Sequence, residues 1–250
     1  MEQNKQRIVV KVGTSTLTHN SGALDLWSME HLVRTLADLQ GMGHEVILVS
    51  SGAIAVGTAK LGLSERPKEL RMKQAAAAVG QCRMMHIYDK FFSEYNRSMA
   101  QILLTGDDVE DPERAEHLSN TFSALLEMGV IPVVNENDSV SSAEIETGRH
   151  KVLGDNDTLS AIVAELCRAD LLVLLSDIDG LYDADPKTHP EAKLLHQVTE
   201  LTPEILEMAG GAGSWRGTGG MATKLSAARI AMNAGCDMVI TNGKRMEDLY

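Results

Sequence analysis

Short apolar runs alternate along this chain with longer segments of helix-forming residues. The runs lie at residues 8–12, 45–49, 99–104, 129–134, 171–175 and 237–241, and we expect a further short strand near residues 194–198. Runs this poor in polar residues indicate strands that are covered on both faces, as in a parallel sheet. Strands that alternate with helices predict helices on both sides of that sheet. We therefore predict an α/β fold with a mainly parallel central sheet.

The bulk composition limits the classes of protein and of partner. A chain of 250 residues with 44% hydrophobic content can bury one sizeable core, so we expect a single domain over residues 1–250. The formal net charge is −12, without a run of five lysines or arginines, which argues against nucleic acid or an anionic membrane as a partner. Three distant cysteines and the absence of a signal peptide or a bilayer-length apolar run indicate a cytoplasmic protein.

Two strand ends near the N-terminus are candidate anion sites. The stretch Ile8–Thr16 reads IVVKVGTST, with Lys11 near the carboxyl end of the strand, where open α/β sheets bind ligands. Gly13 lets backbone N–H groups approach an anion. The strand at 45–49 likewise runs into Ser51, Gly52 and a helix start. Taken alone, the first stretch is equally compatible with a plain buried strand.

Polar residues follow two later segments. Asn135–Ser139 comes directly after a strand, where polar side chains are costly unless they bind a ligand or cap a turn. At the start of the next helix, Asn156 or Asp157 is the expected N-cap. Asp155 and Asp157 together exceed what a cap requires, and such a pair can orient lysines or Mg²⁺.

The last two candidate segments are a strand end and a glycine-rich loop. Ser176 and Asp177 follow the strand at 171–175, and the loop at 210–220 leads into a helix that begins near Met221. The first N–H groups of that helix can bind phosphate, and the alternative is a flexible linker. The chain has no P-loop sequence and no dinucleotide-binding glycine fingerprint at a strand–helix junction. The alanine-rich helix at 69–94 predicts close helix packing, and we assign no chemistry to it.

Seven motifs in a fixed order make these signals specific. They read KVGTSTLT, SSGAIAVG, KQAAAAVGQ, VVNENDSV, LGDNDTLSA, LSDIDGLYDADP and GTGGMATKL. From Val9 to about Asn242 the chain closely resembles the glutamate 5-kinases of the amino acid kinase family, and NEND followed by GDND is particular to that branch. The resemblance implies a three-layer α/β/α sandwich. It also implies ATP- and Mg²⁺-dependent phosphorylation of the γ-carboxylate of L-glutamate, the first step of proline biosynthesis.

Physical chemistry and the resemblance together give the candidate residues. A γ-carboxylate with a pKa near ~4.3 is already ionised at neutral pH and needs no general base. Catalysis then requires cations and positioning. The catalytic candidates are Lys11, Lys224, Asp155 and Asp157. We assign no residue as a direct metal ligand, and we leave open which aspartate orients a lysine and which serves the metal.

The resemblance also assigns the two substrates. For glutamate it implies Ser51, Asp138 and Asn156, with Asn135 close by. Asp138 suits the α-ammonium group, whereas hydroxyl and amide groups suit carboxylates. The residues implied for the nucleotide are Lys11, Gly13, Ser176, Asp177, Thr218, Gly219, Gly220, Met221, Ala222, Thr223 and Lys224.

The resemblance further implies proline as a feedback inhibitor, a homo-oligomer and a hand-off of product to glutamyl phosphate reductase. The chain departs from the family pattern at four places. Ser176 replaces a threonine, the loop Ile145–Gly154 is longer, and the usual Leu-Asn-Ala near Glu116–Leu118 is absent. The chain also stops at Tyr250, before the usual final strand and without a C-terminal RNA-modification-type (PUA) domain, as a natural short form or as part of a longer chain.

Two rival functions remain open from the sequence. One is a kinase of the same family that acts on aspartate, acetylglutamate or a nucleoside monophosphate. Asp138 argues against acetylglutamate, whose blocked amine carries no charge. The other rival is a non-catalytic glutamate or nucleotide sensor, against which the presence of both lysines argues.

Overall fold

The computed structural model describes residues 5–141, 155–186, 188–208 and 220–250. Six strands in these ranges form one sheet in the order β3-β4-β2-β1-β5-β6. Every neighbouring pair in the sheet is parallel, which confirms the predicted sheet type. The strands are β1 (Arg7–Val12), β2 (Glu45–Val49), β3 (Met99–Leu104), β4 (Ile131–Glu136), β5 (Leu171–Ser176) and β6 (Asp237–Asn242).

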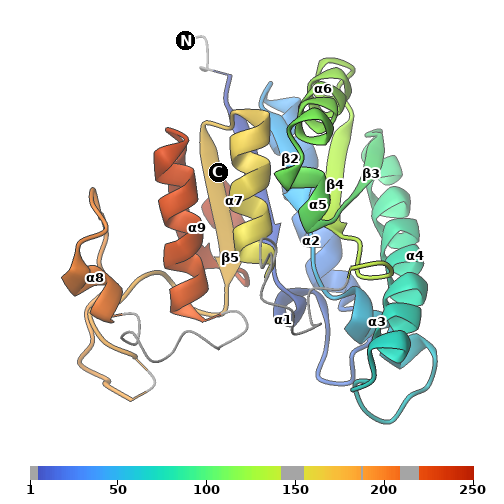
Figure 1. Cartoon of the computed structure of the whole chain (residues 1–250), viewed down its shortest axis with the longest axis horizontal. Helices are drawn as coiled ribbons and strands as arrows, with labels where there is room; N and C mark the ends of the chain where they lie inside the picture. Colours follow the sequence, from blue (N-terminus) through green and yellow to red (C-terminus); the bar gives the residue numbers. More distant parts are fainter. Residues whose placement is uncertain (1–4, 142–154, 187, 209–219) are drawn as a thin grey trace.

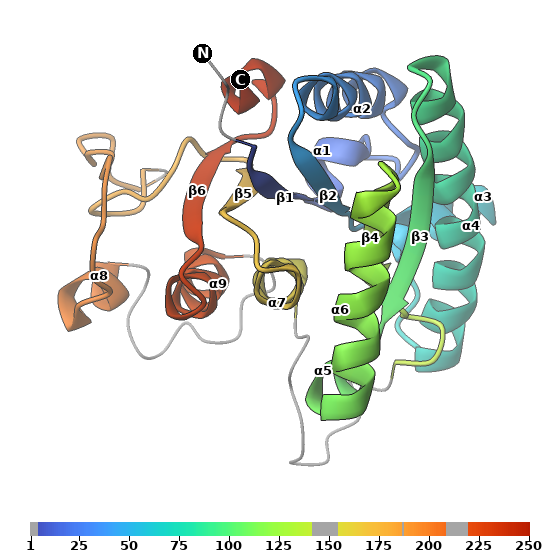
Figure 2. The ribbon, with the colours of Figure 1, turned by 90° about the horizontal axis from the view of Figure 1, so that it is seen from above.

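Helices cover both faces of the sheet, so the predicted three-layer α/β/α sandwich is confirmed. Figure 2 shows α2 and α4 on one face and α6, α7 and α9 on the other. The helices are α1 (Thr14–Leu17), α2 (Leu26–Gly41), α3 (Ala53–Lys60), α4 (Leu70–Glu94), α5 (Gly106–Glu110), α6 (Pro112–Glu127), α7 (Asn156–Cys167), α8 (Pro203–Met208), α9 (Met221–Asn233) and the 3₁₀ turn η1 (Met246–Leu249). None of the helices in the described ranges has the length and apolarity needed to cross a membrane.

Strand β1 separates two hydrophobic cores and decides where Lys11 points. Val10 and Val12 pack with residues of α2 and α4 in one core, whereas Val9 packs with residues of α7 and α9 in the other. Side chains alternate between the two faces of a strand, so Lys11 shares the face of Val9. The lysine is thereby directed toward α7 and α9.

Some predicted elements differ from those observed. The expected strand near 194–198 is wrong, because the described residues there contribute only an isolated bridge from Leu194 to Tyr182. The expected N-cap of α7 is also wrong. The cap is Asp155, whose carboxylate accepts hydrogen bonds from the backbone N–H groups of Asp157 and Thr158. The loops at 145–154 and 209–219 lie outside the described residues.

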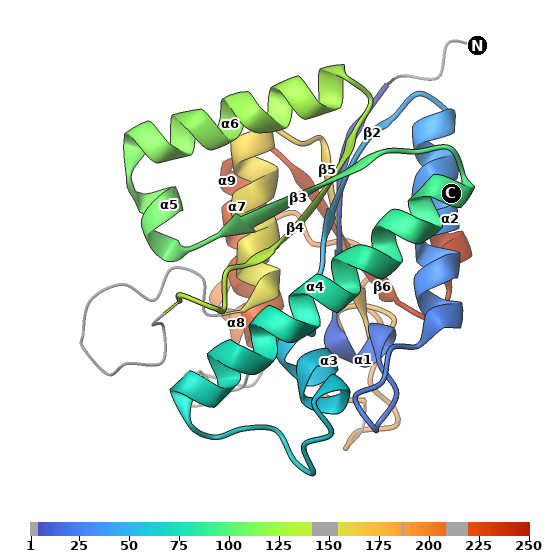
Figure 3. The ribbon, with the colours of Figure 1, turned by 90° about the vertical axis from the view of Figure 1, so that its right-hand side faces the viewer.

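Helices α3 and α4 pack closely, as the alanine-rich sequence predicts, and two glycines permit the contact (Figure 3). A Cβ atom added to Gly57 would lie 1.8 Å from the backbone oxygen of Ala76, and one added to Gly80 would lie 1.8 Å from that of Ala53. Backbone atoms of a packed helix cannot move aside as a side-chain tip can. The crossing therefore fixes α3, which follows the Ser51 turn, against α4.

We expect Gly80→Ala to lower the free energy of unfolding by about 1–3 kcal/mol, because overpacking outweighs the gain in helix propensity. For a chain of this size each kcal/mol lowers Tm by roughly 2–4 °C, which thermal denaturation can resolve. Gly41→Ala is the matched control, since its added Cβ would meet only the flexible side chain of Arg97, at 3.0 Å. Equal melting temperatures for the two variants would contradict the account of the crossing.

Candidate active site

The carboxyl ends of the parallel strands gather the candidate residues at one end of the molecule. In Figure 1 the first turns of α7 and α9 lie at the same end as α1 and α3, the helices that follow β1 and β2. This arrangement agrees with the predicted convergence of the strand-end loops. The ends of parallel strands in such sheets are the usual place for a ligand crevice.

Three charged side chains meet in the interior of this end. The Nζ atom of Lys11 lies 2.7 Å from Oδ1 of Asp157, and the Nζ atom of Lys224 lies 3.0 Å from Oδ2. The Thr223 hydroxyl donates a further hydrogen bond of 2.9 Å to Oδ2. The exposed fractions are 8% for Lys11, 5% for Lys224 and 1% for Asp157. One buried carboxylate thus joins β1, α7 and α9.

The charge balance of this triad favours an anion. Burial by itself raises the pKa of Asp157, but the positive charges of Lys11 and Lys224 outweigh burial and bring the pKa below its usual value. The triad itself, two ammonium groups with one ionised carboxylate, is net positive. Positive groups held in a site with little water attract anions strongly. A phosphate or phosphoryl group next to the lysines suits such a site.

The two aspartates at the start of α7 have different contacts. Asp157 contacts both lysines, whereas the hydrogen bonds of Asp155 given above cap the helix. Their spacing of two residues places one carboxylate on the helix terminus and the other in the interior. The sequence left open which aspartate orients the lysines, and in the described structure that contact belongs to Asp157.

The turns after β1 and β2 are joined through Ser51. Its hydroxyl donates to the backbone oxygen of Val12 at 3.0 Å and accepts a hydrogen bond from the Thr14 hydroxyl at 3.3 Å. Gly52 has a φ of 103°, a left-handed conformation that favours glycine. Gly13 has a φ of −85°, which any residue adopts, and a Cβ there would lie 3.7 Å from Nζ of Lys11. Glycine at position 13 therefore keeps the space beside the lysine open.

Asn135 and Asn156 lie next to each other beside the end of β2. The amide nitrogen of Asn156 donates to the backbone oxygen of Ser50 at 2.6 Å and to Oδ1 of Asn135 at 3.1 Å. Asn135 in turn donates to Oε1 of Gln81 on α4 at 2.9 Å. Gln81 was not among the sequence candidates. The alanine-rich sequence of α4 does not distinguish it from a packing residue, and only its contact with Asn135 identifies it.

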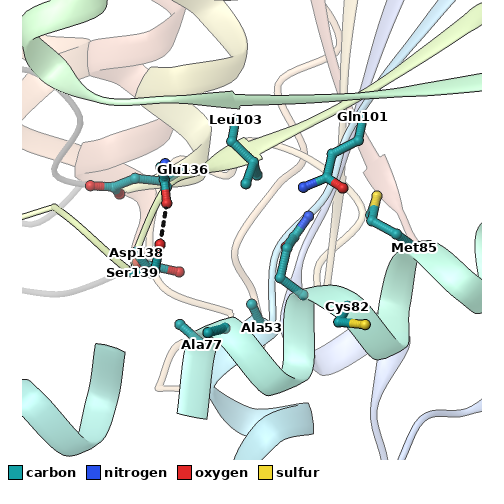
Figure 4. Close-up of a pocket in the computed structure, with 12 residues that line it drawn as sticks. Ala53, Ala77, Cys82, Met85, Gln101, Leu103, Glu136, Asp138 and Ser139 are labelled. Carbon is teal, nitrogen blue, oxygen red and sulfur yellow. Dashed lines mark hydrogen bonds between the residues drawn. The ribbon is translucent and has the colours of Figure 1, made fainter. Parts of the chain in front are cut away.

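A cavity of about 310 Å³ lies between α4 and the chain after β4 (Figure 4). Asp138, Glu136 and Gln81 are among its polar lining residues, and Ala53 and Ala77 keep it open on the side of the helices. Burial raises the pKa of Glu136, and the nearby charge of Asp138 acts in the same direction, against a hydrogen bond from Ser141. The cavity places the predicted substrate residue Asp138 beside the amide network.

Apart from Lys11 and Gly13, the candidate nucleotide residues occupy two segments. Ser176 is buried at the end of β5, and its hydroxyl donates to Oδ1 of Asp177 at 3.3 Å. Helix α9 begins after Gly220, which makes no side-chain cap hydrogen bond, and Met221 and Ala222 form its first positions. The backbone N–H of Thr223 donates to the backbone oxygen of Gly220 at 3.2 Å. Thr218 and Gly219 lie outside the described residues.

Comparisons with known proteins agree with this fold and identify the family. The sequence profile of the amino acid kinase family matches residues 6–242. Among solved structures, a carbamate kinase from Giardia lamblia bound to AMP-PNP superimposes with a TM-score of 0.67 at 15% identity, covering 99% of this chain and 95% of that chain. The T. acidophilum isopentenyl phosphate kinase product complex gives a TM-score of 0.63 at 17% identity, covering 96% and 92%. The chain therefore belongs to the amino acid kinase family.

Curated relatives narrow the group within the family. The chain is 56% identical over 247 residues to the glutamate 5-kinase of Clostridium perfringens, covering 99% of this chain and 91% of that protein. It is 52% identical over 242 residues to the glutamate 5-kinase of Listeria monocytogenes, covering 97% and 87%. A third relative, the glutamate 5-kinase of Caldanaerobacter subterraneus, is 55% identical and is covered over 62% of its length. These relatives place the chain with the glutamate 5-kinases.

Proposed function

We propose that this protein transfers the γ-phosphoryl group of ATP to the γ-carboxylate of L-glutamate, which yields L-glutamyl 5-phosphate and ADP. This reaction is the first step of proline biosynthesis. The observation that carries the proposal is the buried triad of Lys11, Asp157 and Lys224, in a chain that is 52–56% identical to glutamate 5-kinases. The triad supplies the cationic site that transfer between two anions requires.

The lysines carry the chemistry in this proposal. The γ-carboxylate of glutamate attacks as an ionised nucleophile, so the chain needs no general base. Lys11 and Lys224 balance the negative charge on the transferring phosphoryl group and draw the two anionic substrates together. Asp157 holds the two ammonium groups in place, one at each of its carboxylate oxygens, and Asp155 fixes the start of the helix that presents Asp157.

The nucleotide is assigned to the segment around Ser176, Asp177 and the start of α9. Mg²⁺ in kinase sites is commonly bound by one or two carboxylates and by substrate phosphates. Within the described ranges, no group of three His, Cys, Asp or Glu could bind a metal without a substrate. We therefore assign Mg²⁺ to a position where the phosphates of ATP supply most of its ligands. There it would neutralise charge on the γ-phosphoryl group.

Glutamate is assigned to the region of Ser51, Asn135, Asp138 and Asn156, beside the cavity. We also propose that the protein acts in the cytoplasm as a homo-oligomer. Proline is then expected to inhibit it, and glutamyl phosphate reductase is expected to receive the product. The homo-oligomer, the inhibition by proline and the transfer of product rest on the family resemblance. An inhibition curve with proline that stays flat into the millimolar range would count against proline as a regulator.

The experiment that tests the reaction compares acceptor acids. ADP release is measured with ATP and Mg²⁺ and with glutamate, aspartate or acetylglutamate as the acceptor. We expect glutamate to be clearly preferred. Equal rates with all three acids, or turnover with none of them, would remove the assignment, and turnover with aspartate alone would favour the rival member of the family. ATP binding without turnover would favour the sensor.

We expect Asp138→Asn to raise the KM for glutamate by about tenfold or more, because a paired charge in a partly desolvated site contributes roughly 1.5–3 kcal/mol. The KM for ATP is expected to stay within about twofold, since a factor of two is only about 0.4 kcal/mol. Steady-state kinetics with each substrate varied in turn separates the two constants. A matching rise in both would move Asp138 out of the amino acid site.

A further inference from the structure

A hydrogen-bonded network of amide groups runs from the end of β2 to helix α4. It consists of the Ser50 backbone oxygen, Asn156, Asn135 and Gln81, joined by the hydrogen bonds of 2.6, 3.1 and 2.9 Å described above. Asn135 is 2% exposed and Gln81 is 8% exposed. This amide network therefore extends into the interior and connects the start of α7 to the wall of the cavity.

The direction of these hydrogen bonds is determined by one backbone atom. A carbonyl oxygen can only accept, so the Asn156 atom next to Ser50 must be the amide nitrogen. The same nitrogen faces Asn135, which must therefore present its oxygen. Asn135 then turns its nitrogen to Gln81, which must present Oε1. The orientations of all three side-chain amides, which are usually ambiguous, are thus fixed by geometry.

This polarity leaves Asn156 with an acceptor only. The two N–H groups of its amide are used by Ser50 and Asn135, so Oδ1 is the amide atom that remains for a ligand. An oxygen acceptor suits an ammonium group and repels a carboxylate. The sequence assigned amide groups to the carboxylates of glutamate, and the hydrogen bonds of Asn156 argue for the opposite partner.

The amide of Gln81, at the α4 end of this network, has one atom without a described partner. Its Nε2 atom is buried and has no hydrogen-bond partner among the described residues, although Gln81 lines the cavity. A buried donor without a partner costs about 1–3 kcal/mol and calls for an explanation. Glutamine at this position is explained if its other atom, Oε1, is needed to orient Asn135.

We propose that Gln81 is a positioning residue for the amino acid substrate. Through Asn135 it holds the amide of Asn156 with Oδ1 available to the α-ammonium group of glutamate. Loss of the Oε1 acceptor frees the Asn135 amide to rotate, so Asn156 keeps only its hydrogen bond to Ser50 and its Oδ1 is held less firmly toward the substrate. This inference rests on the proposed function, because it concerns the same amino acid site.

The test uses Gln81→Met in the full chain, which keeps the side-chain volume and removes the acceptor. We expect the KM for glutamate to rise about tenfold, equal to about 1.4 kcal/mol, with the KM for ATP unchanged. The inhibition constant of glutarate, which is glutamate without its α-amino group, is expected to stay unchanged. The control is Gln40→Met, since Gln40 also has one buried amide atom without a partner among the described residues and one hydrogen bond, to the backbone oxygen of Gly129. That contact lies next to the start of β4, at the end of the sheet opposite to the carboxyl ends of the strands.

The outcomes separate the possible explanations. Equal rises for glutamate and glutarate, or a fall in kcat with both KM values unchanged, would overturn the positioning role. If Gln81→Met does not fold, Gln81→Glu replaces it, because a carboxyl oxygen still accepts from Asn135. That variant is expected to keep the KM for glutamate within about threefold of wild type, or about 0.7 kcal/mol, and a tenfold rise would overturn the proposal. A wild-type chain that does not phosphorylate glutamate would overturn both this inference and the proposed function.

Discussion

Asp157→Asn is expected to abolish measurable turnover and to lower the free energy of unfolding by about 3–5 kcal/mol, the cost of leaving buried charge without its partner. The reason is the composition of the triad. With an amide at position 157, the ammonium groups of Lys11 and Lys224 are both buried next to a neutral group and repel each other. Chemical denaturation measures the loss of stability, and ADP release measures the loss of activity.

The matched control is Asp155→Asn. Asparagine caps a helix about as well as aspartate, so we expect a change below about 0.5 kcal/mol in the free energy of unfolding. Similar destabilisation by the two substitutions would contradict the view that Asp157, and not Asp155, balances the lysines.

The stability difference between wild type and Asp157→Asn should also depend on pH. The pKa of Asp157 is lowered in the folded protein, so its carboxylate stabilises the fold above the pKa of the unfolded chain, about 3.9. That contribution is lost as the pH falls through the lower, folded-state pKa. We therefore expect the difference to be largest near neutral pH and to shrink below about pH 3.9. A difference that does not change with pH would contradict an ionic role.

Lys224→Met is expected to lower kcat by about 10²- to 10³-fold, as the loss of one charge contact in the transition state commonly does. Methionine keeps most of the buried apolar stem. Asp157 then retains Lys11 as its partner, so one positive and one negative charge remain. We therefore expect a smaller loss of stability than for Asp157→Asn, although the loss of activity is severe.

Lys60→Met is the control for this substitution, because Lys60 is exposed on α3 and far from the triad. Its kcat should match that of the wild-type protein. Steady-state ADP release and thermal denaturation on the same preparations distinguish a catalytic from a structural effect. A kcat for Lys224→Met within tenfold of wild type would remove Lys224 from the reaction.

Much of this architecture could be predicted from the sequence because the strands are short apolar runs that alternate regularly with helix-forming segments. The failures have physical reasons. The segment near Leu194 has apolar residues but forms only one bridge with Tyr182, and local composition cannot reveal the missing pairing. The short elements α1, α5 and η1 were not predicted, since four or five residues give no periodic signal.

The candidate site was predicted in part. Lys11 and Lys224 lie 213 positions apart in the chain, and the structure brings them to one carboxylate, as the parallel sheet requires. The choice between Asp155 and Asp157 could not be made from spacing, because both positions can cap a helix. Gln81 was overlooked because it lies within a helix whose small residues indicate packing alone. Its polarity becomes meaningful only through its contact with Asn135.

The central claim is that the triad serves transfer of a phosphoryl group to the γ-carboxylate of glutamate. An acyl phosphate formed in the presence of hydroxylamine is captured as a hydroxamate, which identifies the carboxylate that received the phosphoryl group. With ATP, Mg²⁺ and glutamate, the wild-type chain should form γ-glutamyl hydroxamate in step with ADP, and Lys224→Met should lose both products together. Release of ADP without the γ-hydroxamate, or capture at the α-carboxylate, would contradict the claim.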